Sequence, residues 1–308
     1  MRLATESEMS RWDGLIAANP DGGRPEQSRA WGELKERLGW QPKHYVYELI
    51  GGKTVAALWL VKKLPLLGEY WYCPGGPGVV SFGDLRQVAE QTKSVGLGAA
   101  WMRFEAPMSA VGVPENDLAN LGIVKANKEL TVSSELFLNL SEYDFPDKAA
   151  RLGLSVEAVA GDDGDLVAMY ELMRAAATAD ESNKLRPLDY YLEGWKQMIA
   201  GGHGRLFFAR YQGERVGGVF VSIFGRRARC HETALTDQVP KKRADLLIHC
   251  EIMRWLQSRG VAEYSLPPEL AADFGLAPTL LIGTWDLPVA GFKYKLWRIW
   301  TQINPRGL

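Results

Sequence analysis

The 308-residue sequence has few of the residues that build disulfide frameworks and metal sites. It contains only three cysteines, Cys73, Cys230 and Cys250, far apart in the chain, and only four histidines. A disulfide framework needs paired cysteines, and a zinc site needs closely spaced Cys or His ligands. The sequence therefore argues against both and favours a chain that is stabilised by hydrophobic cores.

Long hydrophobic runs are also missing. No stretch of about 18 apolar residues occurs, so we expect no helix that crosses a bilayer. Residues 1–13 contain Arg, Glu and Asp but lack the apolar segment of a secretory signal. These two absences predict a cytoplasmic protein.

Charge of one sign is absent as well. The chain has 36 Lys and Arg residues against 37 Asp and Glu residues, a formal net charge of -1. A global positive field for nucleic acid is therefore excluded, and any RNA contact must come from a local patch. The 46% hydrophobic and 24% charged residues are typical of a globular protein, and the length allows one large or two medium domains.

Helix and strand patterns follow a definite order in the first half. Two helices precede three strands, and Gly51-Gly52 between the first two strands is a frequent hairpin signal. A further helix and strand complete the series. The predicted ranges are helices 6–18 and 26–38, strands 44–50, 54–62 and 69–73, helix 83–96 and strand 100–105.

The same order returns in the second half. The ranges are helices 165–178 and 187–199, strands 205–210, 215–224 and 229–235, helix 244–259 and strand 261–266. This is the order of an N-acyltransferase unit of the GNAT type, and its duplication predicts an α+β fold of two tandem GNAT-like units. Mixed, mostly antiparallel sheets should be flanked by helices. We place the first domain at 1–150 and the second, with a C-terminal strand, at 151–308, and expect 129–140 to add closing strands to the first.

Short segments spread over nearly the whole chain carry a resemblance. They are 27–35, Trp40, 72–78, 103–105, 185–191, the Gly217-Gly218 strand, 252–260 and 291–293. In this order and spacing they resemble the FemABX family, the peptidoglycan bridge-forming aminoacyltransferases. The resemblance implies aminoacyl-tRNA as donor and a UDP-MurNAc-peptide or lipid-linked muramoyl-peptide precursor as acceptor. It also implies no cofactor, no metal and a monomer.

The Phe292-Lys293 pair is the first candidate for catalysis. Amide formation from an aminoacyl ester needs charge stabilisation on the tetrahedral oxyanion. The resemblance places Lys293 beside the reacting groups, where its ammonium would supply that charge. On the strand predicted here, Lys293 and Lys295 point to one side while Phe292 and Tyr294 point to the other. The alternative is a solvated lysine on an edge strand.

Glu105 is the second catalytic candidate. It ends strand 100–105, where a carboxylate could receive the proton of the attacking amine directly or through water. The resemblance implies an acidic residue at this place. The alternatives are an ion pair between Glu105 and Arg103 at the strand end, and an amine that loses its proton to substrate or solvent.

Four residues are candidates for binding the precursor. Arg186 lies just before helix 187–199, where a guanidinium and a helix N-terminus can hold a phosphate or carboxylate. The resemblance implies that Arg186 and Tyr190 contact the precursor and that Lys35 and Trp40 line the same pocket. The alternatives are a capping arginine, a surface lysine and a core tryptophan.

His231 and Phe292 complete the predicted binding residues. His231, on strand 229–235, stands where the family more often has a tyrosine that lines the precursor pocket. A buried histidine with satisfied hydrogen bonds is the alternative, and Cys230 should point to the opposite face, into the core. The resemblance predicts one cleft between the halves, lined by Lys35, Arg186, Tyr190, His231 and Phe292.

Two segments bear on acetyl-CoA and RNA. GNAT enzymes bind pyrophosphate on a glycine-rich loop, but Lys241 and Arg243 occupy the positions that need glycine, and the loop at 74–78 carries two prolines without N–H groups. Acetyl-CoA is therefore disfavoured. A CoA-dependent N-acyltransferase for a small amine and a non-catalytic precursor-binding relative stay open. The basic runs 226–229 and 241–243 lie at opposite ends of a strand, so we expect solvated surface rather than one RNA patch.

Overall fold

The chain divides into two compact units in a computed structural model. The structure describes all residues except 97, 114, 128–133, 144–152, 178–184, 239–240 and 304–308. Unit 1 is Met1–Ser134 with Thr279–Leu308, and unit 2 is Glu135–Pro278. This division differs from the predicted boundary at 150, because the end of the chain returns to unit 1 instead of completing unit 2.

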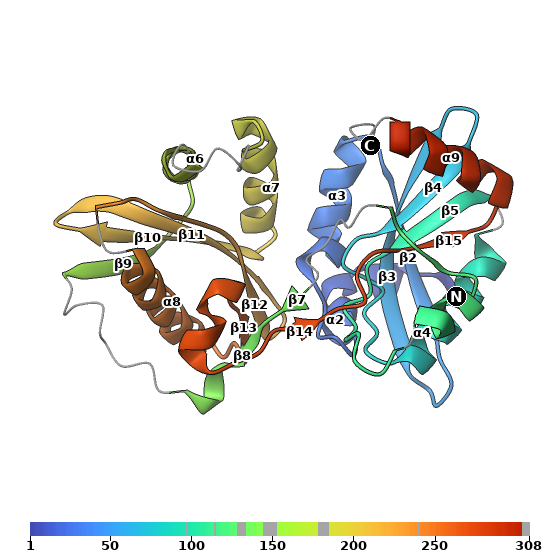
Figure 1. Ribbon diagram of the computed structural model, residues 1–308, viewed down its shortest axis with the longest axis horizontal. Helices are drawn as coiled ribbons and strands as arrows, with labels where there is room; N and C mark the ends of the chain where they lie inside the picture. The colour runs from blue at the N-terminus through green and yellow to red at the C-terminus, as the bar shows by residue number, and fades with distance from the viewer. Residues whose placement is uncertain are drawn as a thin grey trace. The chain divides into compact units, whose positions relative to one another are not determined.

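Unit 1 is built on a seven-stranded sheet. In sheet order the strands are β1 (Arg2–Leu3), β2 (Gln41–Glu48), β3 (Thr54–Leu64), β4 (Gly68–Cys73), β5 (Ala99–Phe104), β15 (Trp285–Pro288) and β6 (Val124–Lys125) (Figure 1). Neighbours are antiparallel except β4 and β5, which are parallel. Helix α4 (Phe82–Val95) forms the crossover that a parallel pair requires.

Helices cover both faces of this sheet. Helices α2 (Trp12–Ala17) and α3 (Arg29–Arg37) pack on β2 and β3, and α9 (Gly291–Ile303) packs on β5. The predicted helix 6–18 is two helices, α1 (Glu6–Met9) and α2, separated at Ser10 and Arg11. A 3-10 turn, η1 (Pro25–Gln27), precedes α3, and α5 (Glu115–Asn120) precedes β6.

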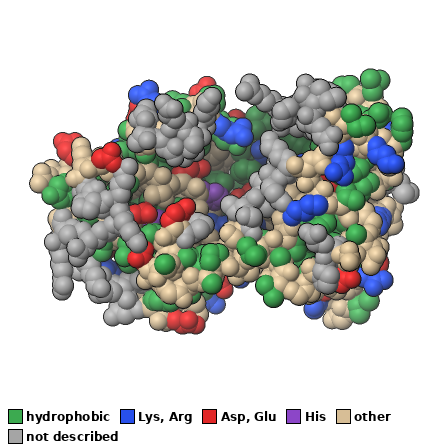
Figure 2. Space-filling view, in the orientation of Figure 1, with side chains coloured by type: hydrophobic (Ala, Val, Ile, Leu, Met, Phe, Trp, Pro, Cys, Tyr) green, Lys and Arg blue, Asp and Glu red, His purple; other side chains and the backbone are tan. Residues whose placement is uncertain are grey.

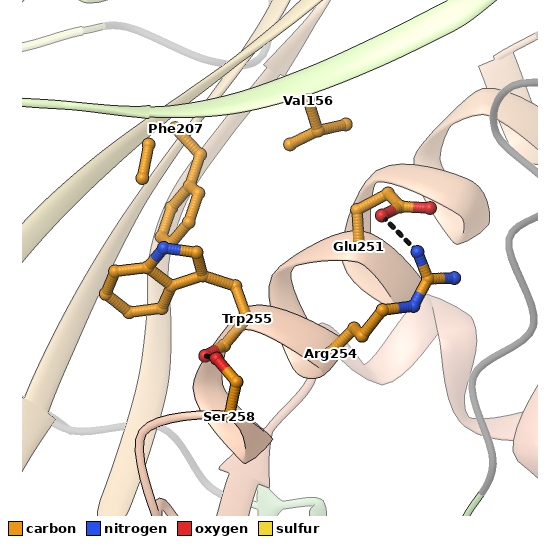
Figure 3. A pocket seen from close by; sticks show the side chains of 7 residues that line it. Val156, Phe207, Glu251, Arg254, Trp255 and Ser258 are labelled. Carbon is orange, nitrogen blue, oxygen red and sulfur yellow. Dashed lines mark hydrogen bonds and ion pairs between the residues drawn. The ribbon is translucent and has the colours of Figure 1, made fainter.

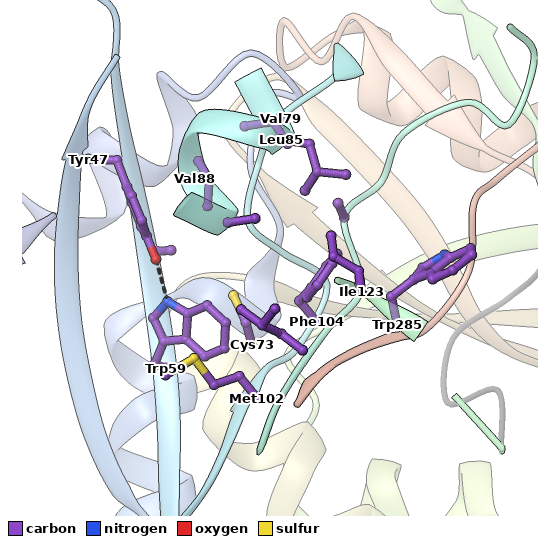
Figure 4. Packing of buried hydrophobic residues seen from close by; sticks show 14 of the residues in the cluster. Tyr47, Trp59, Cys73, Val79, Leu85, Val88, Met102, Phe104, Ile123 and Trp285 are labelled. Atoms are coloured by element: carbon purple, nitrogen blue, oxygen red, sulfur yellow. Dashed lines mark hydrogen bonds between the residues drawn. The ribbon is translucent and has the colours of Figure 1, made fainter. Parts of the chain in front are cut away.

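The core of unit 1 lies between α4 and the sheet (Figure 4). Leu85 and Val88 of α4 meet large side chains from the strands, including Tyr47 and Trp59. Trp59 Nε1 donates a 2.9 Å hydrogen bond to Tyr47 Oη, so the buried polar atoms of both rings have a partner. Burial of each large apolar side chain contributes about 1.5–3 kcal/mol to this packing.

Unit 2 repeats the plan. Its sheet order is β8 (Phe137–Asn139), β13 (Glu263–Ser265), β12 (Arg227–Leu235), β11 (Glu214–Phe224), β10 (Gly204–Tyr211) and β9 (Leu154–Val159). Helices α6 (Asp163–Ala177) and α7 (Leu188–Ala200) lie on one face, and α8 (Lys241–Gln257) lies on the other (Figure 1). Strands β12 and β13 are parallel and joined by α8, as β4 and β5 are by α4. The predicted tandem α+β architecture is confirmed.

The closing strands differ from the prediction. Segment 129–140 was expected to extend the first sheet, but β8 pairs with β13 in unit 2. The place beside β5 is taken by β15, from the far end of the chain. Residues 129–133 lie outside the described part. A separate two-stranded sheet pairs β7 (Ser134–Glu135) with β14 (Thr279–Leu280), and unit 2 also contains the 3-10 turns η2 (Leu140–Glu142) and η4 (Pro268–Phe274).

The predicted terminal strand around Lys293 is wrong, because residues 291–303 form helix α9. The alternation Phe292-Lys-Tyr-Lys imitates a strand over four residues. Over a longer window the buried Tyr294 and Trp297 have helical spacing, and they pack on β5. Lys293 and Lys295 therefore do not share one side. None of the helices built from described residues is both long and apolar enough to cross a bilayer.

Candidate functional site

Glu105 has a buried carboxyl group, and only one of its two oxygens has hydrogen-bond partners among the described residues. It follows β5 directly, with 5% of its surface exposed. Its Oε2 accepts 3.0 Å hydrogen bonds from Tyr72 Oη and from the Gly75 backbone N–H. Its Oε1 is buried and has no hydrogen-bond partner among the described residues. Burial raises the pKa of Glu105, although the bonds from Gly75 and Tyr72 act against this. One carboxyl oxygen is therefore buried without a hydrogen bond from the described residues.

The predicted alternative for Glu105, an ion pair with Arg103, is wrong. Arg103 instead forms a bidentate pair with Asp286 of β15, at 2.7 Å from Nε to Oδ1 and 2.9 Å from Nη2 to Oδ2. Both side chains are buried. Burial lowers the pKa of Arg103, but pairing with Asp286 outweighs it, so the guanidinium stays charged. Glu105 is thereby left without a cationic partner on its own strand.

The loop before α4 is packed, not open. Residues 74–79 are buried, and Gln27 donates a 2.7 Å hydrogen bond from Nε2 to the Pro74 carbonyl. A Cβ on Gly78 would lie 2.4 Å from Asp21 Oδ1, so the segment before η1 fills the space against the loop. A pyrophosphate has no room to approach the backbone N–H groups of this loop.

Trp40 belongs to an aromatic cluster of unit 1. The cluster consists of Trp40, Tyr70, Tyr72, Trp101, Tyr294 and Trp297, with ring centroids 4.5–6.4 Å apart along successive contacts. Trp40 is half-buried and its ring centroid lies 6.4 Å from that of Tyr72. Tyr72 also binds Glu105, so Tyr72 connects these two predicted residues.

Lys35 and Trp40 lie together at the end of α3. The Trp40 backbone N–H donates a 3.0 Å hydrogen bond to the Lys35 carbonyl. The Lys35 ammonium lies 4.7 Å from the ring centroid of Trp31, and the side chain is half-buried. The contact with Trp31 therefore holds the Lys35 ammonium in position, and the side chain is only partly solvated.

Phe292 and Lys293 occupy the first turn of α9 and are exposed. A Cβ on Gly68 would lie 3.5 Å from Lys293 Nζ, so this ammonium sits at the start of β4. Glu105 is bonded to Tyr72 and Gly75, at the other end of β4. Tyr72 lies four positions after Gly68 along the strand, a separation of about 13 Å. The structure therefore does not bring Lys293 and Glu105 to one reacting atom.

Unit 2 brings Arg186 and Tyr190 together. The Arg186 guanidinium carbon lies 4.6 Å from the Tyr190 ring centroid, and both side chains are exposed at the start of α7. Tyr170 Oη donates a 3.1 Å hydrogen bond to the Arg186 carbonyl, which fixes the backbone before the helix. An exposed guanidinium beside a helix N-terminus suits a phosphate or carboxylate.

A β-bulge in β12 places His231 on the sheet face that α7 covers, where its ring lies near Phe220. Phe220 pairs with Glu232 while Val221 pairs with Cys230, so His231 is the extra residue. His231 Nε2 lies 2.7 Å from Ser222 Oγ. His231 is exposed, so the predicted alternative of a buried histidine is wrong. Cys230 packs against the core on the α8 face, as predicted.

The sequence interpretation missed three residues of this group. Tyr191 and Trp195 pack against each other along α7 with ring centroids 5.3 Å apart, and Trp195 Nε1 donates a 3.1 Å hydrogen bond to Glu232 Oε2. Burial raises the pKa of Glu232, against the opposing effects of His231 and Trp195. The i, i+4 spacing of Tyr191 and Trp195 could have revealed their contact, but nothing in the sequence marks the bulge.

The predicted residues are thus divided between the two units. Unit 1 holds Lys35, Trp40, Glu105, Phe292 and Lys293, and unit 2 holds Arg186, Tyr190 and His231. The cleft expected between the halves stays a prediction. Across the described residues, no three His, Cys, Asp or Glu side chains are grouped to hold a metal ion.

In the first basic run Arg226 is exposed, as predicted, but Arg227 and Arg229 are not solvated surface. Arg227 pairs with Glu263 at 2.5 Å, and the buried Arg229 pairs with Glu135 at 3.4 Å. On the face drawn in Figure 2, Lys and Arg side chains are dispersed among other types rather than joined in one patch. Both observations argue against a broad RNA-binding surface on these elements.

A cavity of about 290 Å³ lies on the α8 face of unit 2 (Figure 3). Phe207 and Trp255 form its aromatic wall, and Glu251 accepts a 2.7 Å hydrogen bond from Arg254 at its edge. It is lined by Val156, Ala158, Phe207, Glu251, Arg254, Trp255 and Ser258. None of the predicted site residues lines it.

Comparisons with known proteins agree with this architecture. Residues 146–274 match the family described as Acetyltransferase (GNAT) domain. The crystal structure of FemX is similar with a TM-score of 0.76 and 15% identity, covering 96% of this chain and 99% of that chain. No curated protein sequence matches significantly.

Two further solved structures are similar at a TM-score of 0.51. One is the tandem GNAT protein from the clavulanic acid biosynthesis pathway, with 14% identity over 94% of this chain and 97% of that chain. The other is L-PGS from Bacillus licheniformis, with 10% identity over 96% of each chain. At these identities the likeness establishes the fold. The protein has a tandem GNAT-like fold.

Proposed function

We propose that the protein is an aminoacyltransferase. It would move an amino acid from aminoacyl-tRNA to an amine of a muramoyl-peptide precursor. The observation that carries the proposal is the FemX-like tandem fold over 96% of the chain. The type of reaction is taken from the resemblance of its short segments to the FemABX family. The exposed pair Arg186 and Tyr190 fits the phosphates or carboxylates of such a precursor.

The geometry suggests separate roles for the two catalytic candidates. Lys293 would stabilise the oxyanion of the tetrahedral intermediate, since its ammonium is exposed at the start of α9. Glu105 would accept a hydrogen bond from the acceptor through the unpartnered Oε1, which is buried and must be uncovered by a local movement. The attacking amine would then lose its proton to substrate or solvent, because Glu105 lies too far from Lys293 to serve the same centre.

A second candidate is a CoA-dependent N-acyltransferase for a small amine. The match of residues 146–274 to an acetyltransferase domain favours it. Two features oppose it: Lys241 and Arg243 stand where a pyrophosphate loop needs glycine, and the corresponding loop of unit 1 is buried. Isothermal calorimetry with acetyl-CoA separates the two functions, and aminoacyl transfer predicts no binding heat.

The direct test supplies the full chain with a pool of charged tRNAs and a UDP-linked or lipid-linked precursor. We expect the precursor to gain the mass of one or more amino acid residues in the presence of charged tRNA only. Precursor binding without any mass gain would instead identify a non-catalytic relative. Heat with acetyl-CoA and acetylation of an amine would overturn the proposal.

A further inference from the structure

Helix α9 has apolar side chains on two opposite faces. Tyr294 and Trp297 point inward and are buried in the aromatic cluster of unit 1. Phe292, Leu296 and Ile299, at i, i+4 and i+7, form a stripe on the other face, with exposed fractions of 75%, 45% and 55%. At 100° per residue the stripe lies opposite the buried pair. Folding of unit 1 therefore does not account for the stripe.

Leu66 extends this apolar surface from a second element. It lies in the turn between β3 and β4 and is 100% exposed. Its φ of 65° is in the left-handed region, which costs a leucine about 1 kcal/mol more than a glycine. A glycine would serve the turn better, so the exposed leucine calls for a reason outside folding.

The two elements are neighbours. A Cβ on Gly68 would lie 3.5 Å from Lys293 Nζ, which places the β3–β4 turn beside the first turn of α9. Figure 1 shows α9 and β4 side by side, and in Figure 2 hydrophobic side chains gather at this edge of unit 1 with Lys and Arg beside them. Leu66 and the α9 stripe thus belong to one edge, which we call the apolar edge.

The charged residues in the first three turns of α9 all have one sign. Residues 291–299 contain Lys293, Lys295 and Arg298 and no Asp or Glu. The exposed Lys63 lies near Leu66 at the end of β3, where it pairs across the strands with the half-buried Glu69 of β4. Apolar side chains bordered by cations are typical of a helix that lies in the interface of an anionic membrane.

Other occupants fit this edge less well. A second copy of the chain would bring the same cations face to face, and like charges repel. An RNA backbone would neutralise Lys295 and Arg298 but would offer nothing apolar to Leu66 or Ile299. A lipid surface satisfies both the charges and the apolar side chains.

We propose that the apolar edge docks the protein on an anionic lipid surface. Leu66, Leu296 and Ile299 would enter the boundary between head groups and acyl chains, while Lys63 and Lys295 contact the head groups. Docking is peripheral and does not depend on the proposed transfer reaction. If that reaction holds, docking places the start of α9 at the membrane and selects the lipid-linked form of the precursor.

Sedimentation of the full chain with vesicles tests this inference. We expect binding to phosphatidylglycerol-containing vesicles, little binding to pure phosphatidylcholine, and loss of binding at high salt. The Leu66→Ser/Ile299→Ser variant should bind at least about tenfold more weakly, because each Leu or Ile loses most of its apolar transfer term. Each of Lys63→Gln and Lys295→Gln should weaken binding about fivefold.

Ile50→Ser and Val111→Ser are matched controls, because each is 81% exposed outside the apolar edge. Both should leave vesicle binding unchanged, and circular dichroism should show all variants folded. Wild-type protein that ignores anionic vesicles, or binds them as well after Leu66→Ser/Ile299→Ser as before, overturns the proposal. So does self-association in light scattering that the same two changes abolish. Vesicle binding is measured without substrates, so its failure is distinct from a failure of aminoacyl transfer.

Discussion

Tyr294 Oη donates a 3.0 Å hydrogen bond to Oδ2 of Asp286, the same carboxylate that pairs with Arg103. The bond joins the first turns of α9 to β15, and through Arg103 to β5. The Arg103 guanidinium carbon also lies 5.0 Å from the Trp297 ring centroid. The position of Lys293, next to Tyr294, therefore depends on a buried polar network.

Asp286→Ala tests that network. The change leaves the buried Arg103 without its counter-charge, so we expect the free energy of unfolding to fall by about 3–5 kcal/mol. Urea denaturation followed by circular dichroism measures this. Glu33→Ala is the control, because its pair with Arg29 is exposed on α3, and its cost should stay below about 1 kcal/mol. Equal effects in the two variants would contradict the assigned role of the buried pair.

Lys293→Met tests the oxyanion role. We expect kcat for aminoacyl transfer to fall by about two to three orders of magnitude, the loss typical of one oxyanion donor. Steady-state assays with a UDP-linked precursor measure it, independently of any membrane. Lys53→Met removes a lysine paired with Asp84 and should leave kcat unchanged. A folded Lys293→Met variant with wild-type kcat would remove Lys293 from the mechanism.

Glu105→Gln should change the pH dependence of kcat/KM for the precursor. Burial raises the pKa of Glu105, so the carboxylate that accepts the hydrogen bond is lost as the pH falls through this raised value. Wild-type kcat/KM should therefore decline on the acidic side, and the decline should be absent in the glutamine variant. An unchanged acidic limb in Glu105→Gln would assign the titration to another group.

The same pKa shift predicts a stability difference. The folded pKa of Glu105 lies above the ordinary 4.5, so the folded protein binds this proton more tightly than the unfolded chain. Stability from this group is present below 4.5 and is lost as the pH rises through the raised pKa. Thermal melting over a pH series should show wild type losing stability relative to Glu105→Gln in that window. A constant difference at all pH values would contradict the buried, partly unsatisfied carboxyl.

Arg186→Ala should act on precursor binding. Loss of one charge-assisted contact corresponds to about 1.5–3 kcal/mol, which raises KM about ten- to hundredfold with kcat nearly unchanged. Initial rates at varied precursor concentration measure it. Arg174→Ala is the control, since this exposed arginine pairs with Glu171 on α6 and should leave KM alone. A fall in kcat without a change in KM would argue against a binding role for Arg186.

The sequence predicted most elements because their apolar residues recur with clear periods. Helix 244–259 and strands 215–224 and 229–235 lie close to the observed α8, β11 and β12. The sequence-based prediction failed where the structure depends on pairing between distant residues. Asp286, for example, pairs with Arg103 although the two are 183 positions apart in the chain. Three features of the site were invisible for the same reason: the bulge at His231, the Tyr72 contact of Glu105 and the distance from Glu105 to Lys293.

The strand order of unit 1 has a consequence for synthesis on the ribosome. Strand β15 lies between β5 and β6, yet it follows all of Glu135–Pro278 in the chain. Unit 2 is thus translated in full before β15 can join the sheet of unit 1. Until then, the edge of β5 that pairs with β15 has no partner strand. An unpaired strand edge can pair with another chain. We therefore expect a product that stops before β15 to aggregate through this edge of β5.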